Sequence, residues 1–133
     1  MTVKVLGFTY KPKIEAVHDG RCNQTIRKGR RINTLDELLL FTWSGKPYRS
    51  PWLWRKRAIC TSASPIRVCL DGISLSECTR VLHRWDTPFM DDLAARDFID
   101  PPTGTGLRDV LLKMHKIGED GELFQIIRWK GVD

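Results

Sequence analysis

The chain has 133 residues and a net charge of +6, with 41% hydrophobic and 29% charged residues. This length fits one domain, residues 1–133, with a sizeable core, and the composition excludes a disordered chain. The longest apolar run, Leu38 to Phe41, has four residues, far fewer than the roughly 20 that a membrane helix needs. Met1 to Gly7 lacks the apolar region of a signal peptide, so we expect a cytoplasmic protein with no membrane partner.

The first half of the chain predicts strands, turns and one short helix. Residues 3–9 alternate and predict a strand. Pro12 suits the first turn of a helix that carries Ile14 and Val17 on one face and stops at Gly20. Further strands are expected over residues 22–27, 35–43, 57–62 and 66–70. The connecting segments are a basic turn over 28–31, a proline-containing loop over 46–54 and a break at Ser64-Pro65.

The second half predicts two helices and the last strands. Asp71-Gly72 is typical of a hairpin turn before a strand over 73–75, with an extension over 79–83. Thr87-Pro88 predicts a helix start, and a stripe of Leu107, Val110, Leu111 and Met114 predicts a second helix. A final strand is expected over 123–129. The elements indicate an α+β domain whose sheet is long enough to curl into a small barrel.

The charge is unevenly distributed along the chain. Residues 1–70 contain 14 Lys and Arg against 4 Asp and Glu, whereas residues 71–133 contain 8 against 12. Two basic clusters stand out: Arg21, Arg27, Lys28, Arg30 and Arg31, and then Lys46, Arg49, Arg55, Lys56 and Arg57, which alternate with Trp43, Tyr48, Trp52 and Trp54. Dense like charges repel, and a polyanion relieves that repulsion, so the clusters favour RNA or single-stranded nucleic acid as a partner. A solvated basic face with tryptophans in the core is the alternative.

Metal chemistry and disulfides are disfavoured. Cys22, Cys60, Cys69 and Cys78 include no pair with the two-residue spacing of zinc ribbons, and the three histidines have no metal-binding spacing. Reduced thiols suit a cytoplasmic protein. We therefore expect no metal and no other cofactor.

The segment from Gly7 to Arg31, which contains Gly20-Arg21-Cys22-Asn23-Gln24-Thr25-Ile26-Arg27, resembles the ASCH domains of the PUA-like superfamily. Residues 57–68 and 124–129 are similar to phage-associated members of that family. The resemblance implies a small mixed β-barrel with flanking helices and a cleft for RNA or a modified nucleoside. It also implies, for some members, an amidohydrolase that removes the acetyl group of N4-acetylcytidine with a Lys, a Thr and a Glu.

Carried onto this chain, the resemblance makes Thr25 the candidate nucleophile. The family's Lys position holds Cys22, and its Glu aligns best with Asp109. A thiol of pKa about 8.5 does not replace an amine that activates a threonine, although Cys22 beside Arg21 could itself attack as a thiolate. The family's Asp-Gly-Phe corresponds here to Asp97-Phe98, without the glycine.

Two classes of function therefore stay open. The first is a module that binds RNA or a modified nucleoside through Lys11 and the first basic cluster. The second is a hydrolase of acylated nucleosides or a ribonuclease. Simpler explanations also exist for single residues: Thr25 is a good strand residue, Arg27 can span the barrel, and Asp109 suits the first turn of a helix.

Overall fold

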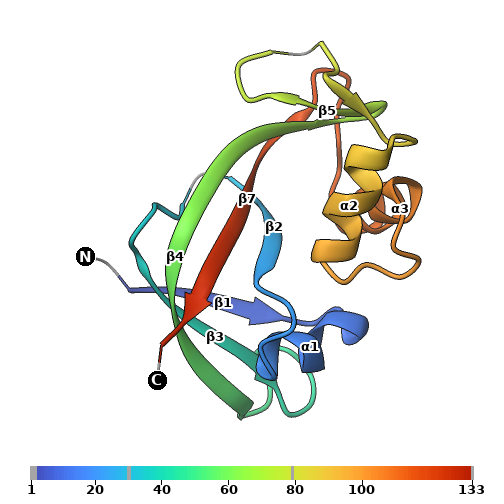
Figure 1. Ribbon diagram of the computed structural model, residues 1–133. Coiled ribbons are helices and arrows are strands. Elements are labelled where there is room, and N and C mark those ends of the chain that lie inside the picture. Colours follow the sequence, from blue (N-terminus) through green and yellow to red (C-terminus); the bar gives the residue numbers. More distant parts are fainter. Residues whose placement is uncertain (1–2, 30, 79, 133) are drawn as a thin grey trace.

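The computed structural model describes residues 3–29, 31–78 and 80–132, which form one seven-stranded mixed sheet and three helices (Figure 1). The strands are β1 (Val3–Phe8), β2 (Gln24–Lys28), β3 (Glu37–Trp43), β4 (Trp52–Cys69), β5 (Gly72–Leu75), β6 (His83–Arg84) and β7 (Glu122–Gly131). The helices are α1 (Lys11–His18), α2 (Pro88–Arg96) and α3 (Gly104–Met114). The predicted α+β class is confirmed.

The 18-residue β4 organises the sheet. It pairs antiparallel with β3 through its first part, with β7 through its middle and with β5 at its end. β1 lies parallel to β3, and β2 pairs antiparallel with β7. Figure 1 shows the long β4 and β7 curving together, with α2 and α3 on the concave side. β1 and β2 are consequently the outer strands of the broad part of the sheet.

The sheet is not closed into a barrel, so the expected barrel was wrong. Closure would require β1 to pair with β2, and no backbone ladder joins them in the described residues. Side chains span the opening instead. Arg27 donates from Nη2 to the Gly7 carbonyl at 2.6 Å, and Arg31 donates to the Val5 carbonyl at 2.9 Å. A long guanidinium side chain satisfies these carbonyls without bringing the strands to the ladder spacing of about 4.8 Å.

Two predictions about β4 were also wrong: the position at which it begins and the break at Ser64-Pro65. The loop expected over 46–54 ends earlier, because β4 begins at Trp52, and Ser64-Pro65 does not break the strand. Pro65 lies opposite Gln125 of β7. Between Ile59 and Ile66, β4 pairs with β7 alone, so a proline is tolerated beside the open edge there.

The helices cover two clusters of buried side chains. In the larger cluster, α2 and α3 pack on the sheet, and its residues include Trp85, Leu107 and Phe124. The smaller one lies at α1 and includes Leu6 and Leu40. The leucines of the predicted α3 stripe are buried, whereas Met114, the last helical residue, is 55% exposed.

The remaining expected elements differ in detail. β2 starts two residues later than expected, and the extension over 79–83 is reduced to β6, with Thr79 outside the described residues. Thr87 does precede α2, but its hydroxyl donates to the Arg84 carbonyl and caps no helix amide. No helix of the described segments has the length and apolar character needed to cross a membrane.

Candidate functional site

A pocket of about 130 Å³, which we call the Lys13 pocket, opens where β1 and β2 diverge. This volume is close to that of a cavity of about 150 Å³ that holds one benzene molecule, so the pocket compares in size with a single six-membered ring. One side is polar and the other is apolar, as in many small-molecule sites. The polar side chains include Tyr10, Lys13, Thr25, Arg27 and Asp97, and the apolar wall includes Ile99, Leu107, Val110, Leu111 and Met114.

The centre of the polar side is a buried ion pair. Lys13 Nζ of α1 lies 2.9 Å from Asp97 Oδ2, and the two side chains are 5% and 6% exposed. Asp97 follows α2 directly and forms its C-cap. Burial raises the pKa of Asp97, and the charges of Lys13 and Arg27 and a hydrogen bond from Gln24 oppose that rise.

Thr25 lies on β2, lines the Lys13 pocket and is 3% exposed. Its Oγ1 accepts a hydrogen bond from Arg27 Nε at 3.2 Å, because residues two apart on a strand share a face. The Arg27 guanidinium also lies 4.9 Å from the centre of the Phe8 ring, and Lys13 Nζ lies 5.8 Å from it. Two cations therefore lie near one aromatic ring, and one of them, Arg27, contacts the threonine.

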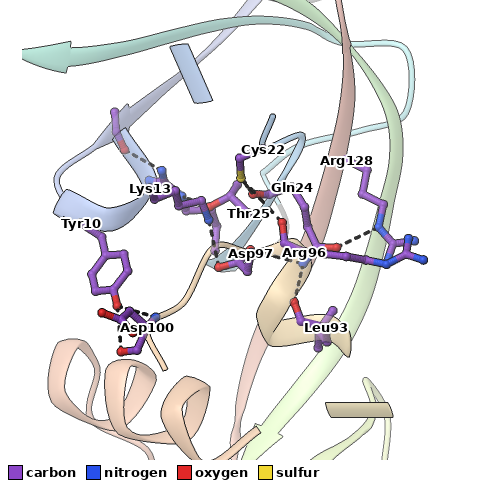
Figure 2. Close-up of polar contacts among 12 residues, drawn as sticks. Tyr10, Lys13, Cys22, Gln24, Thr25, Leu93, Arg96, Asp97, Asp100 and Arg128 are labelled. Atoms are coloured by element: carbon purple, nitrogen blue, oxygen red, sulfur yellow. Dashed lines mark hydrogen bonds and ion pairs between the residues drawn. The ribbon is translucent and has the colours of Figure 1, made fainter. Parts of the chain in front are cut away.

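Gln24 holds Asp97 from the side opposite to the lysine (Figure 2). Its Nε2 donates to Asp97 Oδ1 and to the Leu93 carbonyl, both at 3.3 Å, while its Oε1 accepts from Arg128 Nε at 3.0 Å. Both ends of the amide are thus used, which fixes its orientation. The carboxylate of Asp97 is held by a cation on one oxygen and an amide on the other.

The loop after α2 closes the pocket. The Tyr10 hydroxyl accepts from the Asp100 amide at 3.0 Å and donates to its carbonyl at 3.4 Å (Figure 2). Phe98 takes a positive φ of 56° at the position after the helix cap, where Gly is usual. The Phe98 amide donates to the Ala95 carbonyl, and the Ile99 amide to the Ala94 carbonyl, which completes the turn despite the missing glycine.

His115 lines the Lys13 pocket at the end of α3 and packs edge-on against Phe124, with ring centres 5.0 Å apart. Burial lowers the pKa of His115, and the charges of Lys28 and Arg27 lower it further. The imidazole is therefore neutral at pH 7 and offers one hydrogen-bond donor and one acceptor to a bound ring.

The structure brings Thr25 into the pocket, but not the other two residues proposed for catalysis. Cys22 is fully buried, and its thiol donates to the Gln24 carbonyl at 3.3 Å. Burial raises the pKa of Cys22, which disfavours a thiolate nucleophile. Asp109 lies on the solvent face of α3, with a 69% exposed side chain that pairs with Arg108. Neither residue lines the Lys13 pocket.

The residues predicted to bind nucleic acid are spread over several surfaces. Arg27 lines the Lys13 pocket, whereas Lys11 and Lys28 are exposed at the ends of α1 and β2. Arg31 is exposed and bonds to β1, as described above. Arg21 lies on another face, where it pairs with Asp19 at 2.8 Å. Arg30 lies outside the described residues.

The second basic cluster, with its aromatic residues, forms the hairpin between β3 and β4. Tyr48 is 89% exposed and Trp52 is 37% exposed, while Trp43 and Trp54 are half-buried. Trp52 stacks on Phe41 with ring centres 4.0 Å apart, and Trp43 packs against Tyr48 at 5.0 Å. The hairpin thus carries aromatic surface that the core does not use.

Sequence reasoning missed Lys13 and Asp97. The sequence contained a signal for both residues. Lys13 falls on the helical stripe of the buried Ala16 and Val17, and Asp97 continues the stripe of Met90, Leu93 and Ala94. A charged residue at an apolar stripe position needs a buried partner. That signal identifies each residue as unusual, but it does not identify the two as partners.

In the described part of the chain, no group of three or more His, Cys, Asp or Glu side chains could hold a metal ion. No protein-family model, curated protein or solved structure matches this chain. The chemistry of the site consequently rests on the geometry of its own residues.

Proposed function

We propose that the protein binds a modified pyrimidine nucleoside in the Lys13 pocket and hydrolyses an acyl amide on its base, as in N4-acetylcytidine. The observation that carries this proposal is that an amine, a hydroxyl and a carboxyl, those of Lys13, Thr25 and Asp97, line one pocket. The resemblance to ASCH amidohydrolases requires the same three functional groups. Here Lys13 and Asp97 supply the groups that the sequence resemblance had assigned to Cys22 and Asp109.

In the proposed reaction, Thr25 Oγ1 attacks the acyl carbonyl carbon. A threonine hydroxyl needs a base, and we assign this role to the Lys13 amine, which passes its own proton to the Asp97 carboxylate 2.9 Å away. The hydroxyl proton moves to this amine as the new C–O bond forms. Arg27, whose Nε already donates to Thr25 Oγ1, places positive charge beside the developing oxyanion.

The second half of the reaction releases the two products. As the C–N bond breaks, the Lys13 ammonium returns a proton to the departing amino group of the base. Water then hydrolyses the acyl ester on Thr25, which yields a carboxylic acid and restores the hydroxyl. The Asp97 carboxyl keeps the proton of the ion pair through both steps and returns it to Lys13, 2.9 Å away, once the Thr25 hydroxyl is restored.

The size and the lining of the pocket support a planar ring as ligand. Its volume suits one pyrimidine, and the leucine and isoleucine wall covers a face of such a ring. The neutral His115 offers a donor or an acceptor to the polar edge of the base. The ribose of a nucleoside would then lie toward the opening between β1 and β2.

A second candidate function is binding of the nucleoside without hydrolysis. The observation that favours it is the ion pair itself, since a protonated Lys13 is no base. In this alternative Thr25 and Arg27 serve as hydrogen-bonding groups for the ligand, and the basic first half of the chain attracts RNA.

Release of cytidine from N4-acetylcytidine, followed by chromatography, tests the proposal. We expect turnover by the parent, loss of turnover in Thr25→Ala and partial retention in Thr25→Ser, because serine keeps the nucleophilic oxygen. Asp97→Asn should lower the rate by about 10²–10⁴-fold, the usual contribution of a proton-transfer group. The matched controls Asp109→Asn and Cys22→Ser should keep parental activity, since neither side chain lines the pocket.

Two results would decide against hydrolysis. Turnover that survives Thr25→Ala would remove the nucleophile from the mechanism. Saturable binding of the acetylated nucleoside without any turnover would leave the binding function in place.

A further inference from the structure

A second pocket, of about 320 Å³, lies on the other side of Gln24 from the Lys13–Asp97 pair, and we call it the Arg128 pocket. It is lined by Arg21, Asn23, Gln24, Thr61, Arg96, Phe98, Arg128 and Trp129. These residues come from the start of β2 and the segment before it, from the end of α2 and the loop after it, and from strands β4 and β7. The lining contains three guanidinium groups and no carboxylate.

The three arginines use the same part of the side chain for contacts within the protein. Arg21 Nε and Arg96 Nε donate to Asp19 and Asp92 at 2.8 Å and 3.0 Å, and Arg128 Nε donates to Gln24. In the described residues, the terminal amino groups of all three make no hydrogen bond. Each guanidinium is therefore oriented through Nε while its two-pronged outer edge remains available.

The pocket also carries an excess of positive charge. Asp19 and Asp92 lie outside the lining, with side chains 43% and 67% exposed, and each offsets one arginine. Arg128 has no carboxylate within 4.0 Å among the described residues, and its nearest polar partner is the neutral amide of Gln24. One guanidinium is thus without a counter-charge.

We propose that the Arg128 pocket binds a phosphate group. The planar edge of a guanidinium matches two oxygens of a phosphate, and a tetrahedral phosphate has enough oxygens to meet several such edges at once. A carboxylate has only two oxygens and satisfies fewer of them. The hydroxyl of Thr61 and the ring of Phe98, which lies 5.7 Å below the Arg21 guanidinium, complete the walls.

This site goes beyond the proposed hydrolysis and does not depend on it. The two pockets are lined by consecutive residues: Asp97 faces one, while Arg96 and Phe98 face the other. In the same way Thr25 lines the first pocket and its neighbour Gln24 the second. A ligand of the Arg128 pocket can consequently be detected without any measurement of catalysis.

Titration with inorganic phosphate at constant ionic strength, followed by NMR of the arginine Nε–H groups, tests the site. We expect saturable shifts of the Arg21, Arg96 and Arg128 signals. Arg128→Ala should weaken binding by about tenfold or more, since a hydrogen bond to a charged group contributes about 1.5–3 kcal/mol. Arg84→Ala is the matched control, because Arg84 also pairs with a surface carboxylate but lies outside the pocket.

A second variant covers the case in which Arg128→Ala does not fold. Arg96→Ala removes a 58% exposed side chain, so the fold should tolerate the change, and it should also weaken phosphate binding. Cytidine 5′-monophosphate and the dinucleoside monophosphate CpC then distinguish a terminal phosphate from a backbone phosphodiester. Shifts that do not saturate, or equal weakening by Arg84→Ala, would overturn the proposal.

Discussion

The buried pair of Lys13 and Asp97 gives the sharpest test of how this site is built. We consider three variants: Lys13→Met, which keeps the length of the side chain, Asp97→Asn, which keeps its shape, and the double variant. Each single change leaves one ionisable group about 95% buried without its partner. Removing one partner of a buried ion pair destabilises a protein by about 3–5 kcal/mol.

The double variant should recover much of this loss. Asn at position 97 still accepts the hydrogen bond from Gln24 Nε2, and Met fills the channel of the lysine stem. The remaining defect is one buried amide NH₂ group without a partner, which costs about 1–3 kcal/mol. Additive effects would instead give a loss of about 6–10 kcal/mol, which would unfold a domain of ordinary stability.

Lys13→Met also has a defined pH dependence. Burial already raises the pKa of Asp97, and loss of the lysine charge removes the first of the effects that oppose this rise. The folded state then binds a proton more tightly than the unfolded state, so the free energy of unfolding falls as pH rises from about 4 through the folded pKa. The Asp97→Asn variants lack this dependence.

Urea unfolding followed by circular dichroism at pH 4, 5.5 and 7 measures all three variants. A Lys13→Met protein within about 1 kcal/mol of the parent at pH 7 would refute the buried pair. A folded double variant that still hydrolyses N4-acetylcytidine would show that the pair is structural and would remove it from the proposed mechanism.

Three further predictions concern the surroundings of the site. The unfolding free energy should fall as pH drops below about 6.5, because burial lowers the pKa of His115 in the fold, and NMR titration of its imidazole should give a pKa below that value. Gly104→Ala should destabilise strongly in thermal unfolding, since its Cβ would lie 1.7 Å from the Trp85 carbonyl oxygen; a parental melting temperature would contradict this contact. Gln125→Ala should cost about 1–3 kcal/mol in urea unfolding, because both backbone groups of Ile32 bond to the Gln125 amide, and an unchanged midpoint would show that solvent replaces it.

Local patterns were sufficient for most elements. The structure confirms the strand predicted from the alternation over residues 3–9 and the helices predicted from the Thr-Pro start at 87–88 and from the stripe at Leu107 and Leu111. Alternation and stripe follow the repeat of the backbone itself, so a short segment is enough to predict them. Residues that usually end a strand were less informative. Pro65 reads locally as the end of a strand, yet it lies within β4, because pairing with β7 over ten positions outweighs one missing donor.

The candidate site also contains some residues that the sequence predicts and others that it does not. Thr25 and Arg27 could be predicted from the sequence, since they lie two apart on one strand and share a face by the geometry of that strand alone. The amine and carboxyl beside them could not. Lys13 and Asp97 are 84 residues apart, and their contact depends on how α1 and the end of α2 pack against β2.

The sequence by itself determined the class of fold, the basic first half of the chain and a hydroxyl on a strand next to an arginine, because each depends on composition or on a short period. Only the tertiary structure decided that the sheet stays open between β1 and β2, and that Arg27 and Arg31 bond across this opening. The same opening holds the Lys13 pocket. The physical reason is that pairing of distant strands and burial of charge are set by the whole packed chain, and no local pattern records which partner a buried charge will meet.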